Sequence, residues 1–158
     1  MKKWIFIIIG IVLIIGVTVF FSFLSHLNGV TEDIQAKGES LARSTPIKKV
    51  DEVDLYYGKE ECIVVQGKDA KGNPLMAWFI NGKAEVDDAR KLVTKKSVID
   101  TLKKTNSSIK ILHVTPGKEG DKKFWEVVFL DKNEKYNYYY IDMYTGKLIS
   151  TFYLEKAA

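Results

Sequence analysis

The sequence has few of the residues on which catalysis and covalent cross-linking depend. Its 158 residues include one cysteine, so the chain cannot form an internal disulfide and must be held together by packing. It has only two histidines, and histidine is the side chain that most often performs general acid–base catalysis. No Cys/His cluster has the spacing of a zinc site, and no glycine-rich loop indicates phosphate binding. These absences predict a non-enzymatic protein with no catalytic residues, cofactor, metal or small-molecule substrate.

Neither sign of charge dominates the sequence. Of the 24 Lys and Arg residues, Lys2 and Lys3 precede a long apolar stretch, which leaves 22 basic against 20 acidic residues in the remainder. Nucleic-acid binding needs a basic face, and a balance this close does not supply one. We therefore do not expect nucleic acid to be a partner.

The reactive side chains that are present are better explained by packing than by chemistry. Cys62 lies in the apolar run 61–65 and is expected to be a small buried hydrophobe. His113 lies in the apolar run 111–114, and a catalytic Cys–His pair would require the two residues to meet by chance in the fold. Two acidic runs lack the pattern of a calcium-binding loop and are expected to be solvated loops: Asp51, Glu52 and Asp54, and Asp87 and Asp88.

The longest apolar stretch, residues 4–24, carries no charge and predicts a transmembrane helix. As a helix it would be about 32 Å long, close to the hydrocarbon thickness of a bilayer. The alternative is a cleaved secretory signal, whose apolar region is usually about 7 to 15 residues and ends in small residues at a cleavage site. Phe20 and Phe23 stand where such a site needs small side chains. We therefore predict that residues 1–27 form a cytoplasmic tip and an uncleaved anchor.

The charges that flank this stretch predict its orientation. Lys2 and Lys3 lie before it, Glu32 and Asp33 lie after it, and no Lys or Arg occurs between Lys3 and Lys37. Because the cytoplasmic flanks of membrane helices are enriched in basic residues, the N-terminus is expected in the cytoplasm. The remainder of the chain would then be the extracytoplasmic part of a single-pass protein of the cell membrane.

The rest of the sequence repeats one pattern, a helix followed by strands. In the first copy, a helix after Thr31 precedes three predicted strands: 50–57, 61–68 and 75–81. In the second copy, a helix that opens at Thr94 precedes three or four strands: 109–115, 124–130, 136–141 and 148–154. A short motif recurs with the pattern, because Gly58-Lys59-Glu60 is matched by Gly117-Lys118-Glu119.

This repeat predicts an α+β fold with two small modules, residues 28–90 and 91–158. Each module would pack one helix on an antiparallel sheet, and would either bury the helix on its own or share a core with the other module. An antiparallel sheet that is covered on one face by a helix leaves its other face free.

Aromatic residues are concentrated near the C-terminus. They are Phe124, Trp125, Phe129, Tyr136, Tyr138, Tyr139, Tyr140, Tyr144, Phe152 and Tyr153. Strand alternation places Tyr136, Tyr138 and Tyr140 on one sheet face, and Tyr139 with Ile141 on the other. The uncovered face would display aromatic rings, either for protein recognition or as cross-strand pairs that stabilise the sheet. The candidate partner-binding residues are Trp125, Tyr136, Tyr138 and Tyr140.

Three segments and the apolar N-terminal span carry a family resemblance. The segments are Glu61-Cys62-Ile63-Val64-Val65, Ala77-Trp78-Phe79-Ile80, and Tyr138-Tyr139-Tyr140-Ile141-Asp142-Met143-Tyr144-Thr145-Gly146-Lys147. With them, the whole chain resembles the YpmB or TseB-like family of Gram-positive bacteria. The resemblance implies a membrane anchor followed by two tandem cystatin-like or PepSY-like modules.

The same resemblance implies a function. A member of this family would regulate cell-wall elongation through contact with a class B penicillin-binding protein, a transpeptidase anchored in the same membrane. The family pattern supplies no catalytic residues. The alternative function is a PepSY-type inhibitor or chaperone of an exported peptidase, which would use the same sheet face.

Overall fold

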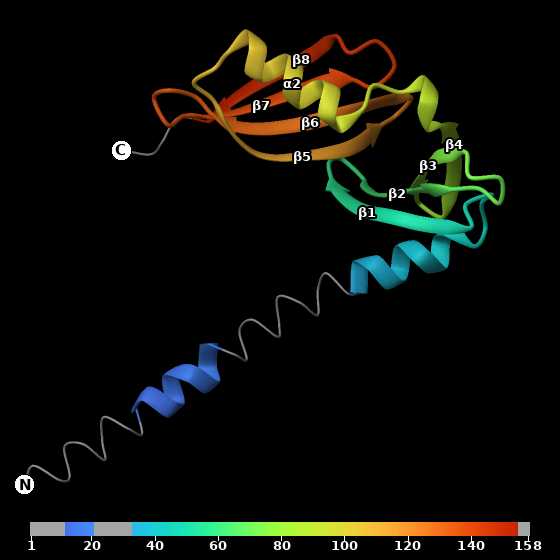
Figure 1. Cartoon of the computed structure of the whole chain (residues 1–158), viewed down its shortest axis with the longest axis horizontal. Helices are drawn as coiled ribbons and strands as arrows, with labels where there is room; N and C mark the ends of the chain where they lie inside the picture. The colour runs from blue at the N-terminus through green and yellow to red at the C-terminus, as the bar shows by residue number, and fades with distance from the viewer. Residues whose placement is uncertain (1–11, 21–32, 155–158) are drawn as a thin grey trace, which may run out of the picture. The chain divides into compact units, whose positions relative to one another are not determined.

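The computed structural model describes residues 12–20 and 33–154 and divides the chain into two units, Met1–Ala36 and Lys37–Ala158 (Figure 1). In the first unit, residues 12–20 are helical and their large apolar side chains are exposed. Within the described ranges, no helix is both long enough and apolar enough to cross a membrane. The rest of the predicted anchor, 4–11 and 21–24, lies outside the described residues.

The second unit contains a first antiparallel sheet of four strands in the order β1-β2-β3-β4. The strands are β1 (Lys49–Tyr57), β2 (Glu61–Lys68), β3 (Pro74–Ile80) and β4 (Lys83–Asp88). The first three strands confirm the prediction closely. The sequence analysis missed β4, because four of its six residues are charged and an apolar alternation is absent. Asn81 and Gly82, both with positive φ, make the two-residue turn that leads into it.

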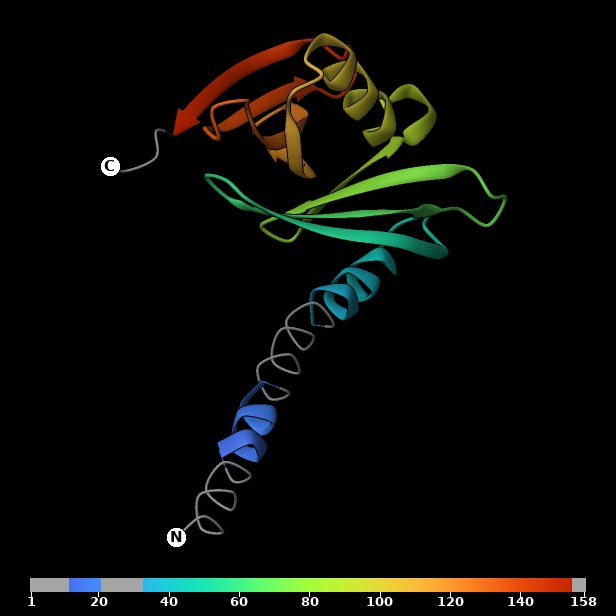
Figure 2. The ribbon, with the colours of Figure 1, turned by 60° about the vertical axis from the view of Figure 1, so that its left-hand side comes forward.

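Both faces of the central strands β2 and β3 are buried. On one face, Ile63 and Val65 pack with Leu41, which belongs to a helix over residues 33–42. Gly38 lets this helix approach the sheet closely, because a Cβ atom at that position would lie 2.5 Å from the Val53 side chain. Figure 2 shows the first sheet between this helix and the second sheet.

The second sheet also has four antiparallel strands, in the order β5-β6-β7-β8. They are β5 (Lys110–Glu119), β6 (Lys122–Leu130), β7 (Tyr136–Asp142) and β8 (Leu148–Leu154). A short 3₁₀ helix, η1 (Ala89–Lys91), and helix α2 (Lys95–Thr105) precede them. Thr94 begins α2 as predicted, because its hydroxyl oxygen accepts a hydrogen bond of 3.2 Å from the Ser97 N–H.

Helix α2 covers one face of the second sheet (Figure 1). Val98 and Leu102 of the helix pack in one cluster with Tyr139 and Ile141 of β7. Alternation along β7 therefore places Tyr140 and the other even-numbered tyrosines on the face away from α2, as predicted.

One hydrophobic core joins the two sheets. It contains Trp78 from the first sheet together with Phe124 of the second sheet and Met143, which follows β7. The two copies of the sequence pattern therefore share a core, which is one of the two arrangements expected. The α+β class with two antiparallel sheets is confirmed, whereas the module boundaries, 28–90 and 91–158, stay a prediction.

The two copies of the Gly-Lys-Glu motif are not structurally equivalent. Gly58-Lys59-Glu60 forms the turn between β1 and β2, but Gly117-Lys118-Glu119 lies within β5, which continues to the end of the motif. The two copies lie against each other instead, since the Lys59 N–H donates to Glu119 Oε1 at 3.4 Å. Gly117 permits this approach, because a Cβ atom there would lie 2.9 Å from the Tyr56 ring.

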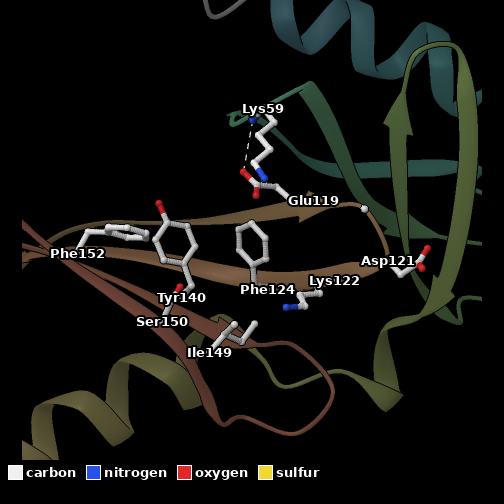
Figure 3. Close-up of a pocket in the computed structure, with 10 residues that line it drawn as sticks. Lys59, Glu119, Asp121, Lys122, Phe124, Tyr140, Ile149, Ser150 and Phe152 are labelled. Carbon is white, nitrogen blue, oxygen red and sulfur yellow. Dashed lines mark hydrogen bonds between the residues drawn. The ribbon is translucent and has the colours of Figure 1, made fainter.

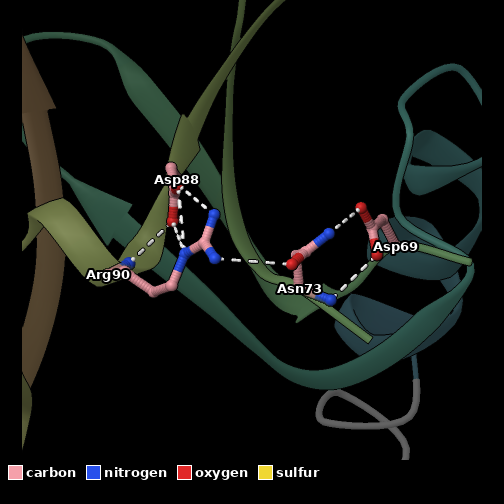
Figure 4. A network of polar contacts seen from close by, with 4 residues as sticks. All are labelled: Asp69, Asn73, Asp88 and Arg90. Atoms are coloured by element: carbon pink, nitrogen blue, oxygen red, sulfur yellow. Dashed lines mark hydrogen bonds and ion pairs between the residues drawn. The ribbon is translucent and has the colours of Figure 1, made fainter. Parts of the chain in front are cut away.

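A polar network fixes the turn before β3 next to η1 (Figure 4). Arg90 donates to both carboxylate oxygens of Asp88, with Nη2 2.6 Å from Oδ2, and also to Asn73 Oδ1 at 3.4 Å. Asn73 in turn donates its side-chain amide to Asp69 at 2.8 Å. The hydrogen bonds from Arg90 lower the pKa of Asp88 to about 2. The network is exposed, so it orders the turn but adds little stability.

Candidate functional site

A groove with a volume of about 740 Å³ lies on the face of the second sheet away from α2 (Figure 3). Its floor is aromatic and consists of Phe124 from β6, Tyr140 from β7 and Phe152 from β8. Charged side chains stand at one end, where the turn between β5 and β6 meets the turn between β1 and β2. The lining residues at that end are Lys59, Glu119, Asp121 and Lys122.

The strand register explains why the aromatic side chains share this face. Glu126 lies opposite Tyr140, and Tyr140 lies opposite Ser150, so side chains two positions along each strand point the same way. A continuous series of edge-to-face contacts results. Ring centroids are 5.3 Å apart for Tyr56 and Phe124, 5.2 Å for Phe124 and Tyr140, and 5.7 Å for Tyr140 and Phe152. The series runs from the first sheet to the outer strand of the second sheet.

Two carboxylates hold the tyrosines of this series in place. The Tyr56 hydroxyl donates to Glu119 Oε1 at 3.2 Å, and the Tyr140 hydroxyl donates to Glu126 Oε2 at 2.7 Å. Burial and then the neighbouring carboxylates raise the pKa of both tyrosines, so the hydroxyls remain protonated donors. The aromatic floor is therefore a rigid surface, because both ring packing and hydrogen bonds fix its orientation.

Exposure increases along the aromatic series. The first two rings are buried, with Tyr56 and Phe124 each 4% exposed, whereas Phe152 at the other end is 59% exposed. Tyr140 between them is half-buried. A partner approaching this face would therefore meet the Phe152 end first, and the buried end would serve as its support.

A second group of polar residues connects β4 to the second sheet. Lys123 Nζ lies 2.7 Å from Asp87 Oδ2 and 3.1 Å from Glu85 Oε2, and Lys118 Nζ lies 3.0 Å from Glu85 Oε1. The two lysine side chains are 7% and 10% exposed, which is unusual for this residue type. We refer to Lys118, Lys123, Glu85 and Asp87 as the inter-sheet clamp.

Asp87 is the best-connected residue of the inter-sheet clamp. It accepts hydrogen bonds from the Trp78 indole N–H at 2.7 Å and from the Tyr144 hydroxyl at 3.1 Å, in addition to Lys123. Burial alone would raise its pKa, but the hydrogen bonds from Lys123 and Trp78 outweigh this effect and lower the pKa. Asp87 thus stays ionised and forms a fixed junction between the two sheets, not the solvated loop that the sequence suggested.

The other acidic run also lies in a strand and not in a loop. Asp54 of β1 is half-buried, and burial together with the nearby Glu52 raises its pKa to about 6. Gln66 donates its side-chain amide to both carboxylates, at 3.0 Å for Asp54 and 3.2 Å for Glu52. Lys95 of α2 pairs with Glu52 at 3.0 Å. Across the described ranges, no three His, Cys, Asp or Glu side chains are placed to hold a metal ion.

Comparison with known proteins places the chain in a family. Residues 42–79, which include β1, β2 and nearly all of β3, match the cell wall elongation regulator TseB-like domain. Over 121 residues the chain is 31% identical to the probable cell wall elongation regulator TseB of Bacillus subtilis (strain 168), and this match covers 75% of each protein. The chain belongs to the TseB-like family of cell wall elongation regulators.

A solved structure supports the same assignment for this TseB-like protein. The YpmB protein from Bacillus subtilis superposes with a TM-score of 0.64 and 29% sequence identity, over 78% of this chain and 96% of that one. The resemblance stated from the sequence is therefore confirmed, as is its general function, regulation of cell-wall elongation.

The structure separates the four candidate binding residues of this TseB-like protein. Tyr136 is 41% exposed, and Tyr138 and Tyr140 are half-buried on the face away from α2. Trp125 is only 2% exposed, so the expectation that it is displayed for binding is wrong. It lies opposite Ile141 on the α2 face and donates its indole N–H to the Val93 carbonyl at 2.7 Å.

The sequence analysis did not select Glu119, Phe124 or Phe152 as site residues. Phe124 and Phe152 were visible as part of the aromatic concentration, and alternation with Tyr140 could have placed them on the same face. No local signal could have found Tyr56, whose hydroxyl reaches Glu119 across a separation of 63 residues.

The two reactive residues lie in different environments. Cys62 is fully buried, and burial raises the pKa of its thiol to about 11, in agreement with the predicted packing role. The His113 side chain is 54% exposed, with Nε2 3.7 Å from Glu126. A fully buried, protonated thiol is not available as a nucleophile, and no Cys–His catalytic pair is expected from this arrangement.

Proposed function

We propose that this chain is a single-pass membrane protein with an extracytoplasmic C-terminal part that regulates cell-wall elongation by binding a class B penicillin-binding protein. Membership in the TseB-like family supports the general role. The nature of the partner rests on the resemblance and on the surface that the second sheet offers. The aromatic face around the groove is the proposed contact surface.

The proposed anchor is supported by the uncharged stretch 4–24 and by Lys2 and Lys3 before it. Residues 12–20, the part of this stretch that is described, are helical, and each large apolar side chain among them is more than half exposed. Such a surface needs an apolar environment. Restriction to the membrane plane would raise the effective concentration of a partner anchored in the same bilayer, so that a modest interface is sufficient.

The main support for the proposed contact surface is the aromatic series that ends at Phe152. Rings at a protein interface contribute large contact area at a small loss of conformational entropy, especially when they are fixed before binding. Phe124 and Tyr140 are fixed by packing and by a hydrogen bond, and Phe152 presents an exposed ring beside them. The charged end of the groove, with Glu119 and Lys122, would supply polar contacts at the rim.

Site-specific photo-crosslinking in living Gram-positive cells tests this proposal. A photoreactive amino acid at Phe152 of the full chain should capture a penicillin-binding protein, which a fluorescent penicillin would identify. Lys71, exposed in the turn between β2 and β3, is the matched control position and should capture none. Equal capture from both positions, or none from Phe152, would contradict the proposed contact surface.

A further inference from the structure

A cavity of about 410 Å³ lies between helix α2 and the outer strands of the second sheet, on the face opposite the aromatic groove. Ser97 and Thr101 line it from the helix, and Tyr139 of β7 and Leu148 of β8 line it from the sheet. Ser97 and Thr101 are four residues apart and lie on the same side of α2. Because both side chains are small, the helix leaves space in front of β8, and Leu148 remains 53% exposed. We refer to this space as the α2 cavity.

Hydrogen bonds fix two of the walls of the α2 cavity. Val93, which lines it, donates its N–H to the Met143 carbonyl at 2.7 Å, and its own carbonyl accepts from the Trp125 indole N–H at 2.7 Å. Thr145, in the turn between β7 and β8, also lines it. Its N–H and its hydroxyl both donate to Asp142 Oδ1, at 2.7 and 2.8 Å. The cavity is therefore formed in advance, which lowers the entropic cost of filling it.

The lining of the α2 cavity contains no charged residue, although 28% of the residues in the chain are charged. Three other cavities have at least three charged residues each in their lining. They are the aromatic groove, a cavity of about 300 Å³ beside the turn between β3 and β4, and a cavity of about 390 Å³ beside Arg43. A charged ligand in the α2 cavity would lose hydration without gaining a partner of opposite charge. The lining therefore favours an uncharged ligand.

The polar groups that the α2 cavity offers to a ligand are hydroxyls. Within the described residues, neither the Ser97 hydroxyl nor the Thr101 hydroxyl makes a hydrogen bond to another residue, because the bonds at these positions involve only their main-chain groups. Each hydroxyl can both donate and accept. The volume of the cavity also lies in the range of about 300–1,000 Å³ that is typical of sites for small molecules, which are mostly apolar with a few placed polar groups.

We propose that the α2 cavity binds a small uncharged molecule with an apolar body and one hydrogen-bonding group. The apolar body lies against Tyr139 and Leu148, and the hydrogen-bonding group pairs with the hydroxyls of Ser97 and Thr101. This site is on the face of the second sheet opposite the proposed contact surface. It therefore does not depend on the proposed function.

Disulfide tethering measures the preference of the α2 cavity in the full chain, held in phosphatidylcholine nanodiscs. Thr101→Cys places a thiol at the cavity. The protein is equilibrated, in the presence of a reductant, with one disulfide that carries an uncharged benzyl group and one that carries a carboxybenzyl group. Thr105→Cys, at an exposed position one turn later on α2 and outside the cavity, is the matched control. The ratio of benzyl to carboxybenzyl adduct, read by intact mass, should be about tenfold higher at position 101 than at position 105.

Competition by a free molecule distinguishes a small-molecule site from a pocket for a side chain of a partner. Benzyl alcohol should lower the yield of the benzyl adduct at Thr101→Cys in a saturable way, whereas benzoate should not, because its carboxylate finds no opposite charge in the cavity. Neither molecule should change the adducts at Thr105→Cys. A benzyl preference that benzyl alcohol does not reduce would show that the cavity accepts only an attached apolar group, and would overturn the proposal.

A change in the apolar wall provides the third measurement. Leu148 and Leu154 are 53% and 55% exposed on the same strand, but only Leu148 lines the α2 cavity. Leu148→Ser should lower the benzyl preference at Thr101→Cys about threefold or more, because it removes apolar surface from the site. Leu154→Ser, the matched control, should leave the preference unchanged. Native Cys62 is kept in every variant as a check of folding, since it is fully buried and takes up a second adduct only in an unfolded chain.

Two further outcomes would overturn the proposal. These are an equal benzyl preference at positions 101 and 105, or equal losses with Leu148→Ser and Leu154→Ser. Tethering and competition decide without the serine variants if one of these does not fold. The result is also separable from the proposed function, because the purified chain is tested without a penicillin-binding protein, and capture from the groove does not require an occupied α2 cavity.

Discussion

The two sheets have the same number of strands and the same antiparallel order, but they differ in what covers their faces. In the first sheet, Cys62–Val65 of β2 and Met76–Phe79 of β3 are buried without interruption, because the helix lies on one face and the second sheet on the other. In the second sheet, β8 has no buried position, and β7 has only two, Asn137 and Ile141. The first sheet thus acts as a support, and the outer strands of the second sheet carry the proposed contact surface.

The largest effect on the free energy of unfolding is expected when a residue of the interior is changed, and a much smaller effect when a residue of the exposed surface is changed. Trp125→Ala should lower the free energy of unfolding by about 3–5 kcal/mol, because it removes a fully packed indole and leaves a cavity. Tyr136→Ala, on the exposed face of the neighbouring strand, should lower it by less than about 1 kcal/mol. Alkylation of Cys62 against urea concentration reports unfolding, since this sole cysteine is fully buried in the fold. Similar losses for the two variants would contradict the assignment of Trp125 to the core.

The inter-sheet clamp is the next test of the comparison. Lys123→Ala leaves the carboxylates of Asp87 and Glu85 without their shared cation, and it should lower the free energy of unfolding by about 2–3 kcal/mol. Lys122→Ala, one residue earlier and exposed, is the matched control and should change stability by less than about 0.5 kcal/mol. The same Cys62 measurement checks both. If the two variants were equally stable, the clamp would not hold β4 to the second sheet.

The sequence predicts those features of the fold that depend on local patterns, such as the alternation of side chains along a strand. Alternation is a local property, so it correctly separated Tyr139 from Tyr140 and allowed seven of the eight strands to be identified. Alternation places Phe124 and Trp125 on opposite faces of β6, but it does not say which of the two faces is covered by α2. Both residues are aromatic and both are buried, so their residue types do not decide the question either, and Trp125 was assigned to the wrong face. Alternation also failed to identify β4. The charged residues of this strand hold the two sheets together, but in the sequence they have the pattern of a solvated loop.

Contacts between the two copies could not be predicted because they join residues far apart in the sequence. Tyr56 contacts Phe124 and Glu119, and Glu85 pairs with Lys118, yet each residue by itself is an ordinary strand residue. The groove is built from such contacts. Its aromatic floor was therefore foreseen only in part, and its supporting carboxylates were not foreseen at all.

Asp54 of β1 should make the stability of the fold depend on pH. The pKa of Asp54 is raised from 3.8 to about 6 in the folded state, so the folded chain binds more protons than the unfolded chain between these values, and stability falls as pH rises through that window. Above about pH 6 the ionised, half-buried carboxylate destabilises the fold. Asp54→Asn should therefore raise the free energy of unfolding by about 1–2 kcal/mol at pH 7.

The pH profile of this variant supplies its own check. The stabilisation by Asp54→Asn should disappear below about pH 4, where the wild-type carboxyl is protonated in both states. Asp51→Asn, at an exposed position three residues earlier, should give a profile parallel to that of the wild type. A gain that persists unchanged at low pH would show that desolvation of Asp54 is not the cause.

At Phe152 the expected effect on stability is small, whereas the expected effect on binding is large. Because the ring is exposed at the end of the aromatic series, Phe152→Ala should change the free energy of unfolding by less than about 1 kcal/mol. Under the proposed function, recovery of a penicillin-binding protein with the full chain from membranes should fall about tenfold, as for the loss of a central aromatic contact.

Tyr57→Ala is the matched control for Phe152→Ala. Tyr57 is 76% exposed, and alternation along β1 directs it to the face opposite that of Tyr56. Its removal should leave recovery of the penicillin-binding protein unchanged, because among the described residues Tyr57 takes part in no ring–ring contact and lies outside the aromatic series. Equal losses for the two variants would show that exposed aromatic area, and not the supported series in the second sheet, determines binding.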